Sequence, residues 1–275
     1  MKHIILTFAL FYGLCAYSQA FKVMTFNIRL DNKEDKENSW TDGNRKERLR
    51  QLLDDEKPAI LGVQEALHHQ MRYLETHFPQ YERVGVGRDD GKEAGEYVAL
   101  YFDKVLFKRI DSGHFWLSQT PDIPSKGWDG KCCNRITTWV KLQYKNKKFF
   151  VFNTHFDHEG IVAQKESAVL ILKKIKELTK DENAEVIVMG DFNITPDNEG
   201  IKTIKKTLTD TYTAYEGIPS GTFTAFKLEQ EPEGRIDFIF ISKGLKSVSY
   251  HIIDRKIDGL YPSDHFPVST LIDFN

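Results

Sequence analysis

An aspartate and an asparagine two positions apart, Asp191 and Asn193, closely follow the apolar run of residues 186–189. A short apolar run before a glycine predicts a buried strand, and alternate residues of an extended chain point the same way. A carboxylate can bind a metal ion or accept a proton from water, and an amide donates hydrogen bonds without adding charge. The pair therefore suits a site that positions water beside an anion. The alternative is an ordinary turn, because Asp and Asn are common turn residues.

Further polar residues stand at the ends of other strand-like apolar runs. Rigid sheets often hold such residues around a ligand, so their repetition predicts one polar cleft. Each could separately be a cap or a turn, although turns do not favour Glu65 or His155. The set comprises Asn27, Glu65, His155, Asp191, Asn193, Asp237, Asp264 and His265.

Strands and helices alternate along the chain to position these residues. Asn44 is a candidate N-cap for a short helix, and residues 159–178 have a long amphipathic pattern. Residues 97–117 and 137–152 have the pattern of paired strands, and the basic run of residues 145–148 is expected to form a hairpin turn. Strands mixed with a few long helices predict an α/β (α+β) protein with helices packed on sheets.

Residues 1–20 have the layout of a secretory signal peptide. A basic start precedes the apolar residues 4–14, and small residues precede the expected cleavage after Ala20. The apolar stretch is too short for a permanent anchor, so no transmembrane segment is expected. The alternative is a first buried strand or helix. We expect an exported protein, periplasmic or secreted, with residues 21–275 forming one catalytic domain.

The charge balance argues against a protein that grips long nucleic acids. The chain has 275 residues and a formal net charge of -2, and removal of Lys2 with the leader makes the charge more negative. Proteins that hold nucleic acids usually carry excess basic residues to pair with phosphates. We therefore expect no stable nucleic-acid complex.

Two adjacent cysteines, Cys132 and Cys133, remain after the leader is removed. Neighbouring cysteines rarely bond to each other because the peptide that joins them must distort. Two thiols with no third cysteine nearby also make a poor zinc site. The sequence therefore predicts loop or strand packing for this pair and no disulfide framework.

Six short motifs that contain the strand-end residues resemble, in order, those of the endonuclease/exonuclease/phosphatase superfamily. The resemblance spans almost the whole chain after residue 20. It implies a four-layer αββα sandwich, with two mixed β-sheets face to face and helices outside, and hydrolysis of phosphate esters with Mg²⁺ or Mn²⁺. The motifs are Thr25-Phe26-Asn27, Val63-Gln64-Glu65, Asn153-Thr154-His155, Gly190-Asp191-Phe192-Asn193, Arg235-Ile236-Asp237-Phe238 and Ser263-Asp264-His265.

The resemblance implies a metal site at Glu65, with Asn27 and Asp264 close by. Oxygen ligands with few carboxylates suit Mg²⁺, which keeps several of its waters.

The resemblance also implies catalytic roles for five residues. Asp191 would orient or deprotonate the attacking water, and Asn193 would donate to the phosphate. His265 would stabilise charge on the phosphoryl oxygens, with Asp237 on its other ring nitrogen keeping it protonated. His155 would be a second phosphate contact. Such groups act mainly by electrostatic stabilisation of the transition state.

One departure from the family pattern bears on the substrate. Nuclease branches that repair DNA often have an acidic residue two positions after the first Asn, where this chain has Arg29. The sequence is more similar to secreted bacterial members, in which Glu96 and Arg135 would fall at the substrate pocket. We expect a monomeric phosphatase or phosphodiesterase acting on a small phosphate ester such as a sugar phosphate. The alternative is a nuclease (endo- or exonuclease) of the same fold acting on DNA or RNA.

Overall fold

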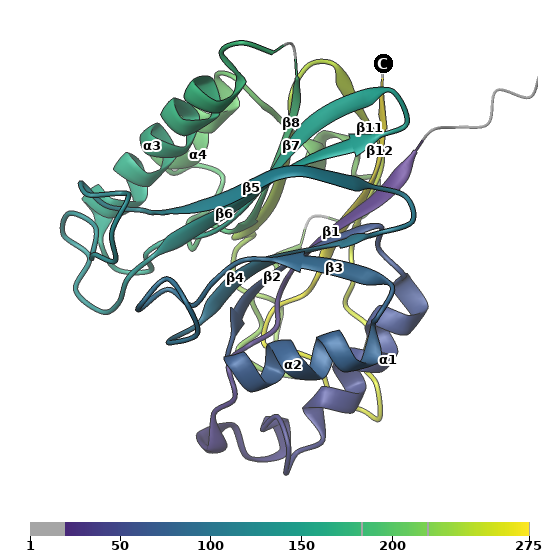
Figure 1. Ribbon diagram of the computed structural model, residues 1–275. Coiled ribbons are helices and arrows are strands. Elements are labelled where there is room, and N and C mark those ends of the chain that lie inside the picture. Colours follow the sequence, from purple (N-terminus) through teal and green to yellow (C-terminus); the bar gives the residue numbers. More distant parts are fainter. Residues whose placement is uncertain (1–19, 183, 219, 275) are drawn as a thin grey trace, which may run out of the picture.

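Two β-sheets of six strands each lie face to face, and helices cover both outer faces (Figure 1). The computed structural model describes residues 20–182, 184–218 and 220–274. The leader predicted for residues 1–20 lies outside the described residues, apart from Ala20. Within those described ranges, no helix is long and apolar enough to cross a membrane.

The first sheet has the strand order β11-β12-β1-β2-β4-β3. Strands β1 and β2 are parallel, and the other neighbouring pairs are antiparallel. A parallel pair needs a long crossover connection, and here the crossover contains a helix. The strands are β1 (Phe21–Asn27), β2 (Ile60–Ala66), β3 (Tyr81–Val84), β4 (Tyr97–Asp103), β11 (Leu245–Ile252) and β12 (Val268–Phe274).

The second sheet, with the order β5-β6-β7-β8-β10-β9, repeats this arrangement. Its parallel pair is β7 and β8, again flanked by antiparallel neighbours and again connected through a helix. The strands are β5 (Lys108–Trp116), β6 (Ile136–Tyr144), β7 (Lys147–His155), β8 (Glu185–Asp191), β9 (Thr209–Asp210) and β10 (Asp237–Ile241).

Of the two predicted strand pairs, one is confirmed and the other is wrong. Residues 97–117 do not form a pair, because β4 lies between β2 and β3 while β5 is an edge strand of the other sheet. Strand β4 is buried along nearly its whole length and fits a sheet interior, whereas the first half of β5 is exposed. The hairpin of residues 137–152 is confirmed, with β6 and β7 joined by a turn at residues 145–146.

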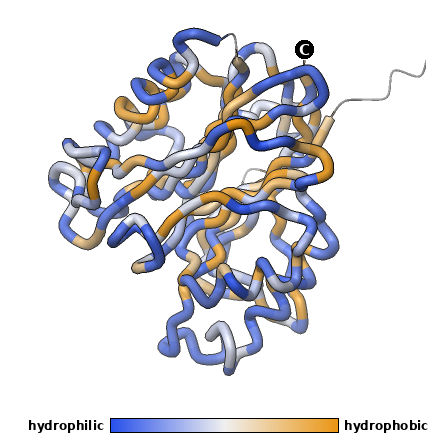
Figure 2. Tube along the Cα trace, viewed as in Figure 1, coloured by the Kyte–Doolittle hydropathy of each residue, from blue (hydrophilic) through white to orange (hydrophobic). Residues whose placement is uncertain are grey.

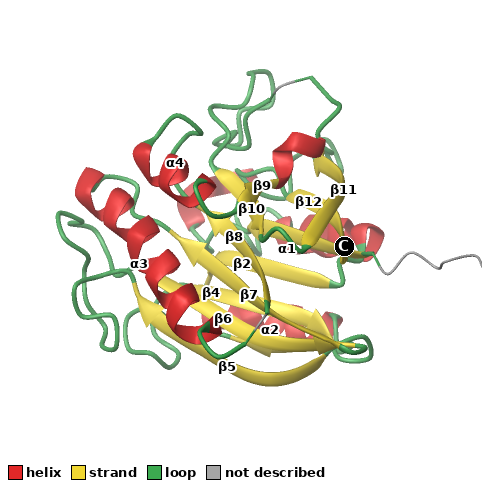
Figure 3. Ribbon diagram, turned by 90° about the horizontal axis from the view of Figure 1, so that it is seen from above, coloured by secondary structure: helices red, strands yellow, loops and turns green. Residues whose placement is uncertain are grey.

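The helices form the two outer layers, and Figure 3 shows the strands between them. Their apolar residues form one cluster with the first sheet and another with the second. The predicted four-layer αββα sandwich is therefore confirmed. The helices are α1 (Arg45–Glu56) and α2 (His68–His77) on the first sheet, and α3 (Ile161–Thr179) and α4 (Glu199–Lys205) on the second, with short 3-10 helices η1 (Lys33–Asn38) and η2 (Thr211–Ala214) in the connections.

The capping role predicted for Asn44 is wrong. Asn44 does precede α1, but its backbone is left-handed, with a φ of 55°, and its side chain makes no capping hydrogen bond. A capping side chain normally needs an extended backbone at that position.

Apolar side chains of both sheets form one buried cluster between them. The strands that carry these residues have long hydrophobic stretches in Figure 2. Val23 and Leu100 of the first sheet and Val151 and Ile239 of the second are completely buried there. Burial of side chains of this size stabilises the folded chain by about 1.5–3 kcal/mol each. This core fixes how closely the two sheets approach each other.

One buried amide, Asn153 of β7, joins the two sheets within this apolar layer. Its Nδ2 atom donates to the carbonyl oxygens of Val63 (2.9 Å) and Ala99 (2.8 Å) in the first sheet. Its Oδ1 atom accepts a hydrogen bond of 2.6 Å from Gln64 Nε2. The β2–β4 ladder is irregular directly after Val63, where a bulge interrupts the pairing. Asn153 therefore supplies hydrogen bonds where the ladder is disrupted.

We predict that Asn153→Leu lowers the free energy of unfolding by about 3 kcal/mol or more, because it leaves two buried carbonyls and one buried amide without their partner. Urea unfolding followed by circular dichroism measures the change. Gln143→Leu on the neighbouring strand β6 is the control. The Gln143 amide donates only locally, to Lys145, so its loss should change stability by less than about 0.5 kcal/mol. Equal effects of the two substitutions would contradict a special role for Asn153.

Candidate functional site

The predicted strand-end residues meet at one edge of the sandwich. Strands β1 and β2, and likewise β7 and β8, end at this edge because each pair is parallel. Strands β10 and β12 begin there because each runs antiparallel to one of them. The edge holds a cavity of about 280 Å³. Its lining comprises Arg29, Glu65, Arg88, Glu96, Cys132, Cys133, Arg135, His155, His158, Asp191, Asn193, Phe223, Asp264 and His265.

Glu65 points into this cavity from a bulge in β2. Its backbone is left-handed, with a φ of 64°, which is uncommon for a residue other than glycine. Its carboxylate accepts hydrogen bonds from Asn27 Nδ2 (3.0 Å) and from the Leu30 backbone (3.2 Å). Burial opposes ionisation of Glu65, but Asn27, His265 and Arg29 outweigh it and lower its pKa. Glu65 is therefore an ionised carboxylate that hydrogen bonds hold in a fixed position.

Asp191 lies at the end of β8 and is almost completely buried. Its Oδ2 atom accepts a hydrogen bond of 2.9 Å from Asn27 Nδ2, across the two sheets. Its Oδ1 atom accepts one of 2.9 Å from the Asn193 backbone. Burial raises the pKa of Asp191 to about 7, and Asp237 raises it too, whereas His265 and Asn27 oppose the shift. A carboxyl group with this pKa can take a proton from a neighbouring group near neutral pH.

Asn193 lies beside Asp191 at the cavity, as predicted, but by a different backbone geometry. Strand β8 ends at Asp191, and Asn193 has a left-handed backbone with a φ of 52°. Its Nδ2 atom donates to the Phe156 carbonyl at 3.1 Å. The turn, rather than strand alternation, brings the two side chains to the same cavity.

His265 is held between two carboxylates. Its Nδ1 atom lies 2.9 Å from Asp237 Oδ2, and its Nε2 atom lies 3.7 Å from Asp191 Oδ2. Burial lowers the pKa of His265, but the two carboxylates outweigh this effect and raise it to about 10. The imidazole is therefore protonated at neutral pH, and its Nε2–H is available to an anion in the cavity.

His155 and Arg135 form the opposite side of the cavity. Arg135 Nη1 lies 3.0 Å from His155 Nε2, and Arg135 Nη2 lies 2.8 Å from Nδ1 of His158. Burial and the adjacent Arg135 charge hold the pKa of His155 well below its ordinary value. His155 is thus neutral, and Arg135 supplies the positive charge on this side.

Glu96 lies in the cavity wall as predicted, paired with an arginine that the sequence analysis did not identify. Arg88 Nη1 and Nη2 donate to the two Glu96 carboxylate oxygens at 2.6 and 2.7 Å. Burial raises the pKa of Glu96 to about 7 in spite of the opposing Arg88 charge. No strand-end or turn signal marks Arg88, because its position in the cavity depends on tertiary packing.

Arg29 is a second cavity residue whose role was not predicted. Its guanidinium lies 3.8 Å from Glu65 Oε2 and 3.7 Å from Asp264 Oδ2, and it forms hydrogen bonds with Asp35. The buried Arg45 side chain donates to the backbone carbonyls of Arg29 and Leu30 and so fixes this segment. The sequence offered a signal, because position 29 departs from the acidic residue of the nuclease pattern.

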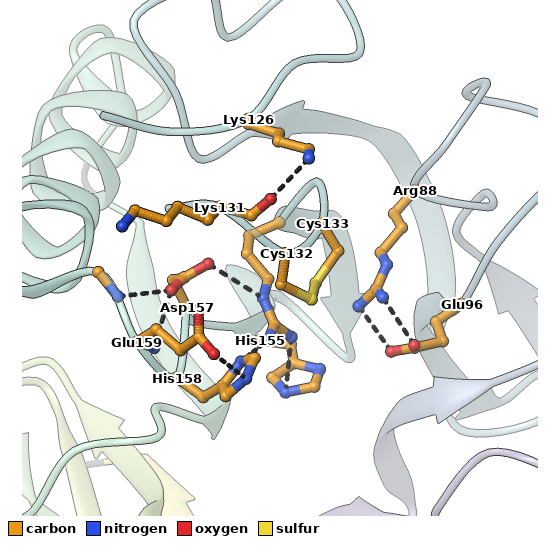
Figure 4. The surroundings of a disulfide bond; sticks show 12 residues. Arg88, Glu96, Lys126, Lys131, Cys132, Cys133, His155, Asp157, His158 and Glu159 are labelled. Carbon is orange, nitrogen blue, oxygen red and sulfur yellow. Dashed lines mark hydrogen bonds and ion pairs between the residues drawn. A yellow bond between two sulfur atoms is a disulfide. The ribbon is translucent and has the colours of Figure 1, made fainter. Parts of the chain in front are cut away.

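The prediction that Cys132 and Cys133 form no disulfide is wrong. The two residues are joined by a disulfide in the loop between β5 and β6 (Figure 4). The loop residues 131–135 lie outside strand pairing, so no ladder restrains the backbone around the bond. The Cα atoms are 3.8 Å apart, the ordinary spacing of neighbours across a trans peptide.

Three side chains that line the cavity fit a small divalent cation. One ligand atom from each of Glu65, His155 and Asp191 lies within 4.8 Å of the others. Two carboxylates and one neutral imidazole are few ligands, and they suit a hard cation that keeps part of its hydration shell. Asp264 and Glu65 both lie close to the Arg29 guanidinium, and the Asn27 amide nitrogen faces Glu65 and orients it.

Comparisons with known proteins agree with this geometry. The model of the Endonuclease/Exonuclease/phosphatase family matches residues 24–265. The structure of a mannosyl-6-phosphatase from Bacteroides thetaiotaomicron is 34% identical, with a TM-score of 0.86, over 92% of this chain and 100% of that one. A family protein from Bacteroides vulgatus is 37% identical, with a TM-score of 0.85, over 93% and 99% of the two chains.

More distant proteins share the fold or part of the sequence. The human Nocturnin catalytic domain is 20% identical, with a TM-score of 0.74, over 93% of this chain and 94% of that one. An uncharacterized protein of Acanthamoeba polyphaga mimivirus is 29% identical over 164 residues, which span 54% of this chain and 58% of that protein. The family model covers most of the chain and includes every strand-end residue of the cavity edge. The chain therefore belongs to the Endonuclease/Exonuclease/phosphatase family.

Proposed function

We propose that this protein is a divalent-metal-dependent hydrolase of a small phosphate ester, such as a sugar phosphate. Its family membership supports phosphate-ester hydrolysis. The observation that carries the proposal is the placement of Asp191, with its raised pKa, beside the protonated His265 in one cavity. A base and a cation so placed suit the attack of water on a phosphoryl group.

The residues of the chain have distinct roles in this reaction. Asp191 orients a water molecule and accepts its proton as the water oxygen bonds to phosphorus and the bond to the ester oxygen breaks. The departing oxygen takes a proton from solvent water and leaves as the alcohol. The imidazolium of His265 and the guanidinium of Arg135 bind phosphoryl oxygens, and the Asn193 amide donates to them. Asp237 keeps His265 protonated and oriented. A cation held by Glu65, with Asp264 near it, supplies further charge stabilisation when bound.

Several features support a small substrate. The cavity volume is about 280 Å³, at the lower end of the range for ligand sites. The formal net charge of -2 gives the protein no excess of positive charge with which to hold a polyanion. The structurally similar Bacteroides thetaiotaomicron protein is described as a mannosyl-6-phosphatase.

A phosphate-release screen tests this function directly. With Mg²⁺ or Mn²⁺ present, the purified protein should release inorganic phosphate from at least one sugar phosphate and leave long DNA and RNA intact. The screen includes a phosphodiester and nucleotides, with products separated by chromatography. Degradation of polymeric nucleic acid without hydrolysis of any small ester would instead indicate a nuclease.

Replacing Asp191 should remove the base. Asp191→Asn keeps the shape of the side chain but cannot accept the proton, so kcat should fall by about 100-fold or more. Steady-state kinetics on the best substrate of the screen measure this effect. Asp197→Asn is the control, because Asp197 is an exposed aspartate six residues further on that bonds only to Thr195 among the described residues. Equal rates for Asp191→Asn and the wild-type protein would overturn the assigned role.

Removal of the metal ion should abolish activity, and added Mg²⁺ should restore it. Glu65→Gln removes one negative oxygen ligand, so the Mg²⁺ concentration for half-maximal rate should rise by at least about 10-fold. The control is Glu93→Gln, a carboxylate whose side chain is 75% exposed. Activity of Glu65→Gln with an unchanged Mg²⁺ requirement would show that Glu65 does not hold the cation.

A further inference from the structure

The Cys132–Cys133 disulfide lines the same cavity as Glu65, Asp191 and His265. Figure 4 shows it between the Arg88–Glu96 pair on one side and His155 and His158 on the other. Cys132 is exposed and Cys133 is half-buried, so the bond is accessible from solvent. The disulfide thus forms part of the rim through which a substrate reaches the catalytic residues.

This disulfide does little for the stability of the fold. A disulfide stabilises a protein mainly by closing a loop in the unfolded chain, and the effect grows with the length of that loop. Here the bonded residues are sequence neighbours, with a separation of 1, and close almost no loop. The reason for the bond must therefore be sought in the local surface that it creates.

That surface differs chemically from the rest of the cavity. Bonded sulfur atoms are polarizable and present an apolar face with little hydrogen-bonding capacity. Among the described lining residues, the other apolar side chain is Phe223, which packs against His265 with ring centroids 5.0 Å apart. Apart from Phe223, the disulfide is therefore the apolar part of the described cavity lining.

Hydrogen-bonding groups flank this apolar wall. The Arg88–Glu96 pair lies beside it, and Glu96 keeps lone pairs free for further donors while both of its oxygens bind Arg88. The loop is fixed at both ends, by the bond of 2.6 Å from Lys126 Nζ to the Lys131 carbonyl and by the contact of 3.3 Å from Asn134 Nδ2 to the Arg88 carbonyl. The wall and the polar pair are therefore held in a fixed relation.

An apolar face with a polar rim matches one kind of leaving group. A sugar ring presents C–H groups on its face and hydroxyl groups around its edge, so it can contact sulfur and hydrogen-bond to Glu96 at the same time. Arg88 and Glu96 neutralise each other's charge, so the pair offers no excess positive charge to a second phosphate. A nucleobase would gain more from an aromatic platform, which this side of the cavity does not offer among the described residues.

We propose that the Cys132–Cys133 disulfide is the apolar wall of a leaving-group subsite that accepts the C–H face of a sugar ring, while Glu96, held by Arg88, binds the ring hydroxyls. The proposal rests on the phosphohydrolase function proposed above and specifies the part of the substrate that is not phosphate. It makes the disulfide a specificity-determining element with no part in the bond-breaking step.

The double variant Cys132→Ser/Cys133→Ser tests the subsite. On a panel of hexose phosphates, kcat/KM should fall by about 10-fold through KM, as expected for loss of one good apolar contact. On glycerol phosphate, which has no ring, kcat/KM should change by less than about twofold. Lys126→Ala is the control for loosening of the loop, because it removes the bond to the Lys131 carbonyl and leaves the sulfur atoms in place.

Chemical reduction of the disulfide in the wild-type protein is a second test of the subsite. A dithiol transfers two electrons and two protons to the disulfide, giving two cysteine thiols and the oxidised dithiol. Reduction should reproduce the selective loss on hexose phosphates in the wild-type protein and have no effect on the double serine variant. The number of free thiols, counted with a thiol reagent, confirms that reduction has occurred.

Several outcomes of these tests would overturn the proposed sugar-ring subsite. If the double serine variant lost as much kcat/KM on glycerol phosphate as on hexose phosphates, the disulfide would only hold the loop. The same conclusion would follow if Lys126→Ala lost kcat/KM on hexose phosphates as selectively, and by as much, as the double serine variant. A double serine variant with unchanged kcat/KM, or a wild-type preference for nucleotides, would exclude a sugar wall.

If the wild-type protein released phosphate from no ester, the proposed function would fail, and calorimetric binding of a hexose phosphate would decide the subsite separately. Binding weakened by the serine substitutions would support it, and unchanged or absent binding would overturn it.

Discussion

The alignment of the two sheets depends on amide side chains that hydrogen-bond across the space between them. Asn153 of the second sheet meets the disrupted β2–β4 ladder of the first, and Asn27 of the first sheet reaches Asp191 of the second. Apolar packing alone is non-directional and would tolerate small shifts of one sheet over the other. Directional bonds at fixed positions remove that freedom. The cavity residues, which come from both sheets, thereby keep one relative geometry.

Two cations of the cavity, Arg29 and His265, are tolerated because each lies between carboxylates. Arg29 lies between Glu65 and Asp264, and His265 lies between Asp237 and Asp191. Burial of an unpaired carboxylate or cation is strongly unfavourable, so such groups persist only in alternating arrangements. Two of these carboxylates can therefore serve a second purpose. Asp191 and Glu65 each balance a neighbouring cation, and a carboxylate is also the group that a general base or a metal site needs.

The sequence was sufficient for the features that are local in the chain. The mixture of strands and helices and the strand ends with Asn27, Asp191 and His265 could be predicted from local patterns, whereas the αββα layers followed from the resemblance of six short motifs to a known family. The partnership of Arg88 with Glu96 could not, since it depends on how the β3–β4 connection folds back. The disulfide was missed because a general preference against bonding between sequence neighbours says little about a loop that lies outside strand pairing. The misassigned pairing of β4 and β5 has a related cause, since strand patterns do not specify which sheet a strand joins.

The antiparallel pairing of β1 with β12 has a consequence for the order of events during synthesis. Asn27 and His265 are 238 residues apart, yet their side chains lie 3.5 Å from each other. A ribosome-bound chain that has not yet released β12 therefore possesses Asn27, Glu65 and Asp191 but lacks the imidazolium that faces them. The arrangement of His265 beside Asn27 and Asp191 can form only after the chain has been translated past β12 and this strand has docked beside β1.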